Sequence, residues 1–214
     1  MLIMARAPRP GAAKTRLEPL LGPTACARLQ SALIRHTAGW AASAVARTCV
    51  AFTPADAQAE LAPLVPPDTS LVAQRDGDLG ARLTHACAHV FDGRGPLVVV
   101  GTDAPLLGPD HVRVAERELR RGRDACLIPA LDGGYTLIAL ARPAPEVFAL
   151  PPEAWGGPRV LEWTLRALRR AGLTHALLDP VGDVDTPRDA LALRDDPRCP
   201  TAVRAALRAQ GPAA

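Results

Sequence analysis

Short apolar runs alternate with longer segments of helical periodicity along most of the chain, and this alternation restricts the fold more than any other feature. The strongest run, in Pro96–Pro105, is apolar without interruption from Leu97 to Val100, as expected of a strand covered on both faces. Alternating strands and helices predict an α/β fold, in which a mainly parallel sheet carries helices on both faces. Because ligands of such sheets bind outside the carboxyl ends of the strands, the residues after each strand are the candidates for function.

The order of the elements follows from the same pattern. Strands are predicted at Leu2–Ala5, Thr48–Pro54, Ser70–Gln74, Pro96–Pro105, Ala125–Ala130, Tyr135–Leu140 and His175–Asp179. Helices are predicted at Thr24–Val45 with Thr24 as its N-cap, around Asp56–Leu61, at Asp78–Phe91, Pro109–Arg121 and Arg159–Ala171, and in segments from Pro187 onward. A chain of 214 residues suits one domain with its own core, so we expect a single domain over residues 1–214.

Composition excludes several classes of function. The net charge is +3, acidic and basic residues are interleaved, and no basic block indicates a nucleic-acid surface. The five cysteines are widely spaced without a C-x-x-C pair, which argues against a disulfide framework and a zinc site. No segment approaches the roughly 18 apolar residues of a membrane span, and the apolar run before Arg6 is too short for a signal peptide. We therefore expect a cytoplasmic protein with no nucleic-acid partner and no membrane span.

The loop after the first strand contains the only lysine of the chain, Lys14, although Lys and Arg together number 25. Its sequence, ARAPRPGAAKTRL, supplies Gly11 for close approach of the backbone to a ligand, and Arg6, Arg9 and Arg16 as further cations. These residues suit phosphate, but the G-x-x-x-x-G-K-[ST] frame of a P-loop is absent. A solvated basic loop is the alternative, since loops rich in Gly, Pro and Arg are common.

Two aspartates follow predicted strands. Asp103, in GTDAP, comes directly after the strongest apolar run, and Asp185, in GDVDTP, precedes Thr186, a predicted N-cap. Either could be structural: Asp103 could cap the helix near Pro109, and Asp185 could simply precede the cap. Two carboxylates at strand ends and a cationic loop are, however, the usual parts of metal-assisted chemistry on phosphates, with Mg²⁺ or Mn²⁺ as the cation.

The segment DGGY, which consists of Asp132, Gly133, Gly134 and Tyr135, lies between two predicted strands. Two glycines allow a backbone to lie close against a substrate. The alternative is a hairpin turn with no further role, because D-G pairs are also common in turns.

Taken in order, the motifs ARAPRPGAAKTRL, QRDGDLGARL, GTDAP, PALDGGYTLIAL, AW followed by VLEWTL, and DVDTPRDAL resemble those of the bacterial DUF2064 family. These are glycosyltransferase-like proteins of the GT-A, or nucleotide-diphospho-sugar transferase, superfamily. The resemblance extends from Leu2 to about Leu193. It implies a three-layer αβα fold with a mixed, mostly parallel seven-stranded sheet, and a single nucleotide-binding transferase domain.

The resemblance also implies roles for individual residues. The superfamily's phosphate-loop cation corresponds to Lys14, with Arg16 nearby, and its metal-binding aspartates correspond to Asp103 and Asp185. Asp132–Tyr135 falls where the acceptor or the transferred group would bind, and Asp132 is then a candidate for orienting or deprotonating the acceptor. Arg6 and Gly11 would contribute to nucleotide binding.

One departure from the glycosyltransferase pattern leaves the reaction open. Many GT-A glycosyltransferases carry D-x-D after the fourth strand, where this chain has Gly101-Thr102-Asp103. In that respect it is similar to nucleotidyltransferases of the superfamily, such as the molybdenum-cofactor nucleotidyltransferases and the phospholactate guanylyltransferases. The leading hypothesis is transfer from a nucleoside-diphosphate sugar to an unknown small acceptor. Nucleotidyl transfer from an NTP to a phosphorylated acceptor is the alternative, and a non-catalytic nucleotide-binding module is the second. The oligomeric state stays open.

Overall fold

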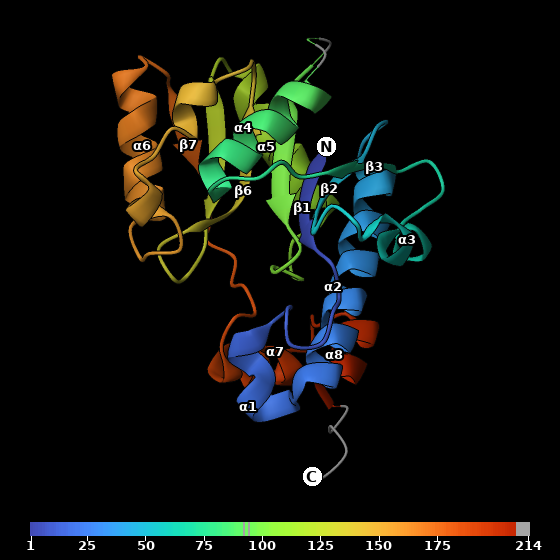
Figure 1. The fold of residues 1–214 in the computed structure, drawn as a ribbon. Helices are drawn as coiled ribbons and strands as arrows, with labels where there is room; N and C mark the ends of the chain where they lie inside the picture. The colour runs from blue at the N-terminus through green and yellow to red at the C-terminus, as the bar shows by residue number, and fades with distance from the viewer. Residues whose placement is uncertain (92, 94, 209–214) are drawn as a thin grey trace.

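The computed structural model describes residues 1–91, 93 and 95–208, and within them a single sheet organises the molecule (Figure 1). The strand order is β3-β2-β1-β4-β6-β5-β7. All neighbours are parallel except β6, which runs antiparallel to β4 and to β5. The strands are β1 (Leu2–Arg6), β2 (Cys49–Thr53), β3 (Ser70–Ala73), β4 (Leu97–Gly101), β5 (Ala125–Pro129), β6 (Tyr135–Leu140) and β7 (His175–Leu177). The predicted mixed, mostly parallel seven-stranded sheet is therefore confirmed.

Helices cover both faces of this sheet, because successive strand residues point to opposite sides. On one face, Ile3 and Val100 pack with side chains of α2 (Pro23–Ala44), α3 (Gln58–Leu61) and α5 (Pro109–Arg120). On the other face, Leu2 and Val99 pack with α4 (Leu79–Val90) and α6 (Val160–Arg170). The result is a three-layer αβα arrangement with an apolar core on each side of the sheet.

The remaining helices form a separate group beyond the carboxyl ends of the parallel strands. It consists of α1 (Glu18–Leu21), α7 (Pro187–Asp195), α8 (Thr201–Arg208) and the first half of α2, and we call it the helical lobe (Figure 1). The lobe has its own apolar core, in which Leu29 of α2 and Val203 of α8 are fully buried. It therefore holds the chain segments before α1 and before α7 against the edge of the sheet where ligands are expected.

Several predicted elements differ from the structure by a few residues at an end, and two of these differences bear on the site or have a clear local reason. Thr24 is not the N-cap of α2: Pro23 occupies the first turn and Gly22 the cap, because the fixed φ of proline is already suited to helix entry. Strand β4 ends at Gly101, and Thr102 and Asp103 lie in the bend that follows. The N-cap of α5 is Gly108, so Asp103 does not cap that helix. None of the helices in the described ranges combines the length and apolarity of a membrane-crossing segment.

Candidate functional site

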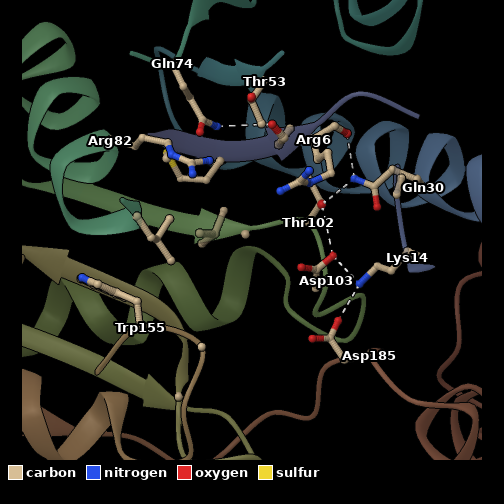
Figure 2. Close-up of a pocket in the computed structure, with 18 of the residues that line it drawn as sticks. Arg6, Lys14, Gln30, Thr53, Gln74, Arg82, Thr102, Asp103, Trp155 and Asp185 are labelled. Carbon is tan, nitrogen blue, oxygen red and sulfur yellow. Dashed lines mark hydrogen bonds and ion pairs between the residues drawn. The ribbon is translucent and has the colours of Figure 1, made fainter. Parts of the chain in front are cut away.

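A cavity of about 750 Å³ opens at the carboxyl ends of the strands, where ligands of parallel sheets bind. Its lining comes from the ends of β1, β2 and β4, the loop after β1, the start of α4, and the beginning of β6. Lys14, Asp103 and Asp185 lie together at one end of the cavity, while Gln74 and Arg82 lie toward the other (Figure 2). The fold thus brings together residues that are far apart in the sequence.

Lys14 lies at the centre of the charged end. Its Nζ is 2.5 Å from Oδ1 of Asp103 and 2.9 Å from Oδ1 of Asp185. It also donates a hydrogen bond of 2.9 Å to the backbone carbonyl of Val184. Three oxygen atoms therefore surround one ammonium group, which has three donors to satisfy.

The environment of Lys14 keeps the group charged. Its side chain is only 6% exposed, which excludes the solvated-loop interpretation for this residue. Burial lowers the pKa of Lys14, but the charges of Asp103 and Asp185 and their hydrogen bonds outweigh burial, so the pKa lies above its ordinary value. Lys14 also has left-handed backbone geometry, with φ of 54°, which is uncommon outside glycine. A strained backbone at a buried charge indicates that the packing around Lys14 holds its backbone in this conformation.

Sequence reasoning missed Val184 and Gln30, two residues that hold this cluster. Val184 is fully buried in the helical lobe, its N–H donates to the carbonyl of Asp103 at 2.9 Å, and its carbonyl accepts from Lys14. Gln30 of α2 is 3% exposed and donates to the carbonyl of Arg6 at 3.1 Å and to Oγ1 of Thr102 at 3.2 Å. The signal for Gln30 was a polar residue on an otherwise apolar helix face, whereas a lone valine between aspartates gives no such signal.

The other cations of the loop differ in their freedom to meet a ligand. Arg16 lies 3.8 Å from Oδ2 of Asp185 and its side chain is 69% exposed, and Arg6 is exposed at the end of β1; both line the cavity. Arg9 instead contacts Glu60 at 2.6 Å and Asp56 at 3.1 Å, which ties the loop to the region of α3.

Gly11, in the same loop, lines the cavity with φ of 74°. Such a conformation favours glycine. The loop can therefore bring its backbone to the cavity at this position without a side chain in the way.

The DGGY segment forms the turn between β5 and β6. Oδ1 of Asp132 accepts a hydrogen bond of 2.9 Å from the N–H of Gly134, and Asp132 is exposed. Gly133 has φ of 95°, and a Cβ there would lie 1.9 Å from the carbonyl oxygen of Pro158. The backbone of Gly133 therefore lies close against the backbone of Pro158. Gly134 and Tyr135 line the cavity, but the hydroxyl of Tyr135 is buried and burial raises its pKa.

The acidic character of the site extends to Asp183. Burial, the largest cause, and the nearby charges of Asp132, Asp185 and Asp103 together raise the pKa of Asp183 to about 6. The effect of Asp132 indicates that the β5–β6 turn and the segment after β7 face the same region. Asp183 and Asp132 thus lie within electrostatic range of each other and of the region of Asp103 and Asp185, the two aspartates that contact Lys14.

The opposite end of the cavity is apolar with two polar side chains. The side-chain nitrogen of Gln74 donates to the carbonyls of Ala51 at 2.7 Å and Ala5 at 3.3 Å. Because carbonyls only accept, Oε1 of Gln74 is the atom left to meet a ligand. Nε of Arg82 donates to the carbonyl of Gly77 at 2.8 Å, which leaves its terminal nitrogens as donors toward the cavity. The neighbouring apolar lining includes Met4, Leu79, Leu83 and Val99.

We expect Gly133→Ala to destabilise the protein by about 2 kcal/mol or more, since it combines a positive φ with a backbone clash. Gly134→Ala is the matched control: a Cβ there meets only Oδ1 of Asp132 at 3.2 Å and Cβ of Ala130 at 3.9 Å, so the cost should stay near 1 kcal/mol. Urea unfolding of both variants measures the difference, and equal losses would contradict the steric argument.

The raised pKa of Asp183 predicts a pH dependence of stability in metal-free protein. Between pH 3.8 and about 6 the folded state binds more protons than the unfolded state, so the free energy of unfolding falls as pH rises through this window. Asp183→Asn should remove this fall and stabilise the protein at pH 7 by about 1 to 3 kcal/mol, the lower value allowing for screening by water. Urea unfolding in EDTA across the pH range measures it. Asp68→Asn, an exposed site before β3, is the control, and a pH slope shared by wild type and Asp183→Asn would refute the prediction.

Comparison with known proteins identifies the family and the fold of the chain. The family model described as "Uncharacterized protein conserved in bacteria (DUF2064)" matches residues 37–153. A proposed nucleotide-diphospho-sugar transferase from Desulfovibrio desulfuricans G20, of known crystal structure, is 30% identical, with a TM-score of 0.86 over 97% of this chain and 92% of that one. No curated protein matches the chain.

More distant structures share the fold. CMP:2-keto-3-deoxy-manno-octonic acid synthetase in complex with CTP is 17% identical, with a TM-score of 0.57 over 91% of this chain and 98% of that one. Rv0371c from Mycobacterium tuberculosis H37Rv is 21% identical, with a TM-score of 0.58 over 90% and 95% of the two chains. The expected nucleotide-diphospho-sugar transferase-like fold is therefore confirmed. Because the family model spans more than half of the chain, the protein belongs to the DUF2064 family.

Proposed function

We propose that this protein is a metal-dependent transferase that uses a nucleotide-activated donor, with a nucleoside-diphosphate sugar as the leading candidate. The observation that carries the proposal is the cluster of Lys14, Asp103 and Asp185 at one end of a cavity that continues to Gln74 and Arg82. A site with charge at one end and an apolar, hydrogen-bonding surface at the other suits a molecule with phosphates joined to a nucleoside. The nucleotide-sugar assignment of the Desulfovibrio relative supports the same class of donor.

The donor set at the charged end fits a divalent cation. Mg²⁺ is usually held by one or two carboxylates together with substrate phosphates and water. Asp103 and Asp185 provide the carboxylates, and no group of three or more His, Cys, Asp or Glu among the described residues forms a complete metal site. When bound, Mg²⁺ or Mn²⁺ would offset the negative charge that develops on the phosphates as the bond to the transferred group breaks.

Side chains of the cavity would bind the rest of the donor. Arg6 and Arg16, which are exposed at the cavity, would bind the donor phosphates, and Lys14 would add a compact charge beside them. The nucleoside would lie over the apolar lining near Met4, with Gln74 and Arg82 at the polar edge of its base. Neighbouring strands are about 4.8 Å apart, so the span from the end of β3 to the end of β4 is about 14 Å, which suits the length of a nucleoside diphosphate.

The acceptor would approach from the β5–β6 turn. Gly134 and Trp155 line the cavity on this side, and Asp132 is exposed at the turn. The Oδ1 atom of Asp132 already accepts from Gly134, so Oδ2 is the oxygen that could orient an acceptor hydroxyl. A carboxylate in this position is suited to accept a proton as the acceptor attacks.

Nucleotidyl transfer is a second candidate, favoured by one feature of the charged end. Only Asp103 follows β4, and the end of β1 and the segment after it bring three cations to the cavity, Arg6, Lys14 and Arg16. That much positive charge suits a triphosphate, which carries more negative charge than a nucleotide sugar, and a departing pyrophosphate. The two candidates differ in the product that is released.

The products released from a panel of substrates decide between these candidates. The protein is incubated with Mg²⁺, the common NTPs and NDP-sugars, and mixed small acceptors, and both pyrophosphate and NDP are followed. We expect release of NDP from a sugar donor. Release of pyrophosphate from an NTP would instead show nucleotidyl transfer and refute sugar transfer. Asp103→Asn and Asp185→Asn should each lower turnover at least about a hundredfold. Asp68→Asn, which lies outside the cavity, should leave turnover unchanged. Retained turnover in both site variants would place the active site elsewhere.

The nucleoside end generates a separate prediction about binding. Arg82→Gln should raise the Kd for nucleoside diphosphates about tenfold, because it removes donors that face the cavity, but should not change binding of inorganic pyrophosphate. Arg75→Gln is the matched control, since Arg75 is exposed in the same segment and does not line the cavity. Calorimetric titration with ADP, CDP, GDP, UDP and pyrophosphate tests it. A variant that weakens pyrophosphate and nucleotide equally would place Arg82 at the phosphates instead.

A further inference from the structure

Lys14 takes up the oxygen atoms that a divalent cation would need. Its Nζ contacts Oδ1 of both Asp103 and Asp185, the two carboxylates assigned above to the metal, and the carbonyl of Val184 completes the set. The ammonium group is therefore enclosed by three oxygens, as a bound cation would be. Figure 2 shows the side chain of Lys14 directed at both carboxylates.

A metal and Lys14 would not share these oxygens at low cost. A divalent cation on the same two Oδ1 atoms would lie within a few ångströms of the ammonium group. The side chain of Lys14 is only 6% exposed, so water screens little of the resulting repulsion. Removing the ammonium from both carboxylates without a new anionic partner would in turn leave a buried charge unpaired, which is strongly unfavourable.

We propose that Lys14 and the divalent cation compete for Asp103 and Asp185, so that the metal binds tightly only together with a phosphate-bearing nucleotide. The proposal rests on the nucleotide site described above. Nucleotide phosphates give Lys14 a new anionic partner when it leaves the carboxylates, and they give the metal its remaining ligands. Metal and nucleotide binding are then coupled, and by linkage each tightens the other by the same factor.

This competition also explains why the one lysine of the chain stands here. An ammonium group is a compact point charge with three donors, and its stem is flexible enough to redirect those donors. A planar guanidinium would not bring one atom within 3 Å of three converging oxygens. It would also exchange less readily with a metal ion, because its fork pairs two oxygens at once.

The test is the affinity for Mn²⁺, measured by electron paramagnetic resonance of free Mn²⁺ rather than by turnover. Wild type should bind Mn²⁺ weakly alone and at least about tenfold more tightly with a saturating nucleoside diphosphate. ADP, CDP, GDP and UDP are the probes, and complexes of Mn²⁺ with nucleotide in solution are included in the fit. Lys14→Met should bind Mn²⁺ alone at least about tenfold more tightly than wild type and should show a smaller coupling factor, because only the phosphate ligands of the metal then contribute to it.

Arg16→Met is the matched control. It removes a positive charge from the same loop, but Arg16 is exposed and lies 3.8 Å from Asp185, so both Oδ1 atoms stay paired with Lys14. Its affinity for Mn²⁺ should change by less than about threefold. If Lys14→Met does not fold, as judged by circular dichroism, the equally uncharged Lys14→Gln provides the same comparison, and the coupling in wild type is measured independently of any variant.

The outcomes separate this inference from the proposed function. Equal Mn²⁺ affinity with and without nucleotide in wild type, or the same affinity in wild type and the Lys14 variant, would overturn the competition while nucleotide binding still stood. Failure of every nucleotide to bind would instead refute the proposed function. A gain of Mn²⁺ affinity in the Lys14 variant would even then support the competition for the two carboxylates.

Discussion

The ammonium group of Lys14 joins three segments of the chain that reach the site by different routes. Asp103 arrives at the end of β4 in the middle of the sheet, Asp185 arrives with the segment that leads into the helical lobe, and Lys14 arrives in the loop after β1. Two carboxylates placed side by side would repel each other without a cation between them. The geometry of this end of the cavity therefore depends on a positive charge at one point, whether Lys14 or a metal supplies it.

The helical lobe gives this arrangement its rigidity. Val184 anchors its side chain in the apolar core of the lobe, while both of its backbone polar groups bind the site. Gln30 of α2, the first half of which belongs to the lobe, donates to the carbonyl of Arg6 at the end of β1 and to the hydroxyl of Thr102 just after β4. Apolar packing in the lobe thus fixes the distances between the charged groups of the site. Charged groups that are already held in place need not move during a reaction, which is the advantage of a preorganised electrostatic site.

Much of this could be predicted from the sequence, because the signals were local. The apolar run before Asp103 marked a central strand, and Asp103 lies just after the end of β4, while Thr186 with Pro187 marked the start of α7. Asp185, however, lies well beyond the end of β7 at Leu177 and directly before that helix. The mixed sheet followed from the resemblance to the family. The start of α2, by contrast, was predicted one residue too late. The helix begins at Pro23, and its N-cap is Gly22 rather than Thr24.

The contacts of Lys14 could not be predicted, since they depend on tertiary distances. Nothing in the loop sequence indicates left-handed backbone geometry at a non-glycine residue, or that Lys14 would be buried against Asp103 and Asp185 while Arg9 turned away to Glu60. The role of Val184 depends on backbone atoms, which every residue type has. Its position between two aspartates was visible, but the reason for it was not.

The separation of these partners along the chain has a consequence for synthesis in the cell. Lys14 and Asp185 are 171 residues apart, so the ribosome must add a long stretch of chain after Lys14 before these two charges can meet. Contacts of such long range form late and slow the folding of a domain. Until then, Asp103 is the one carboxylate of the pair that Lys14 can meet, and a chain that is cut short before Asp185 cannot complete the cluster. Translation through Asp185 is thus a condition for assembling the site.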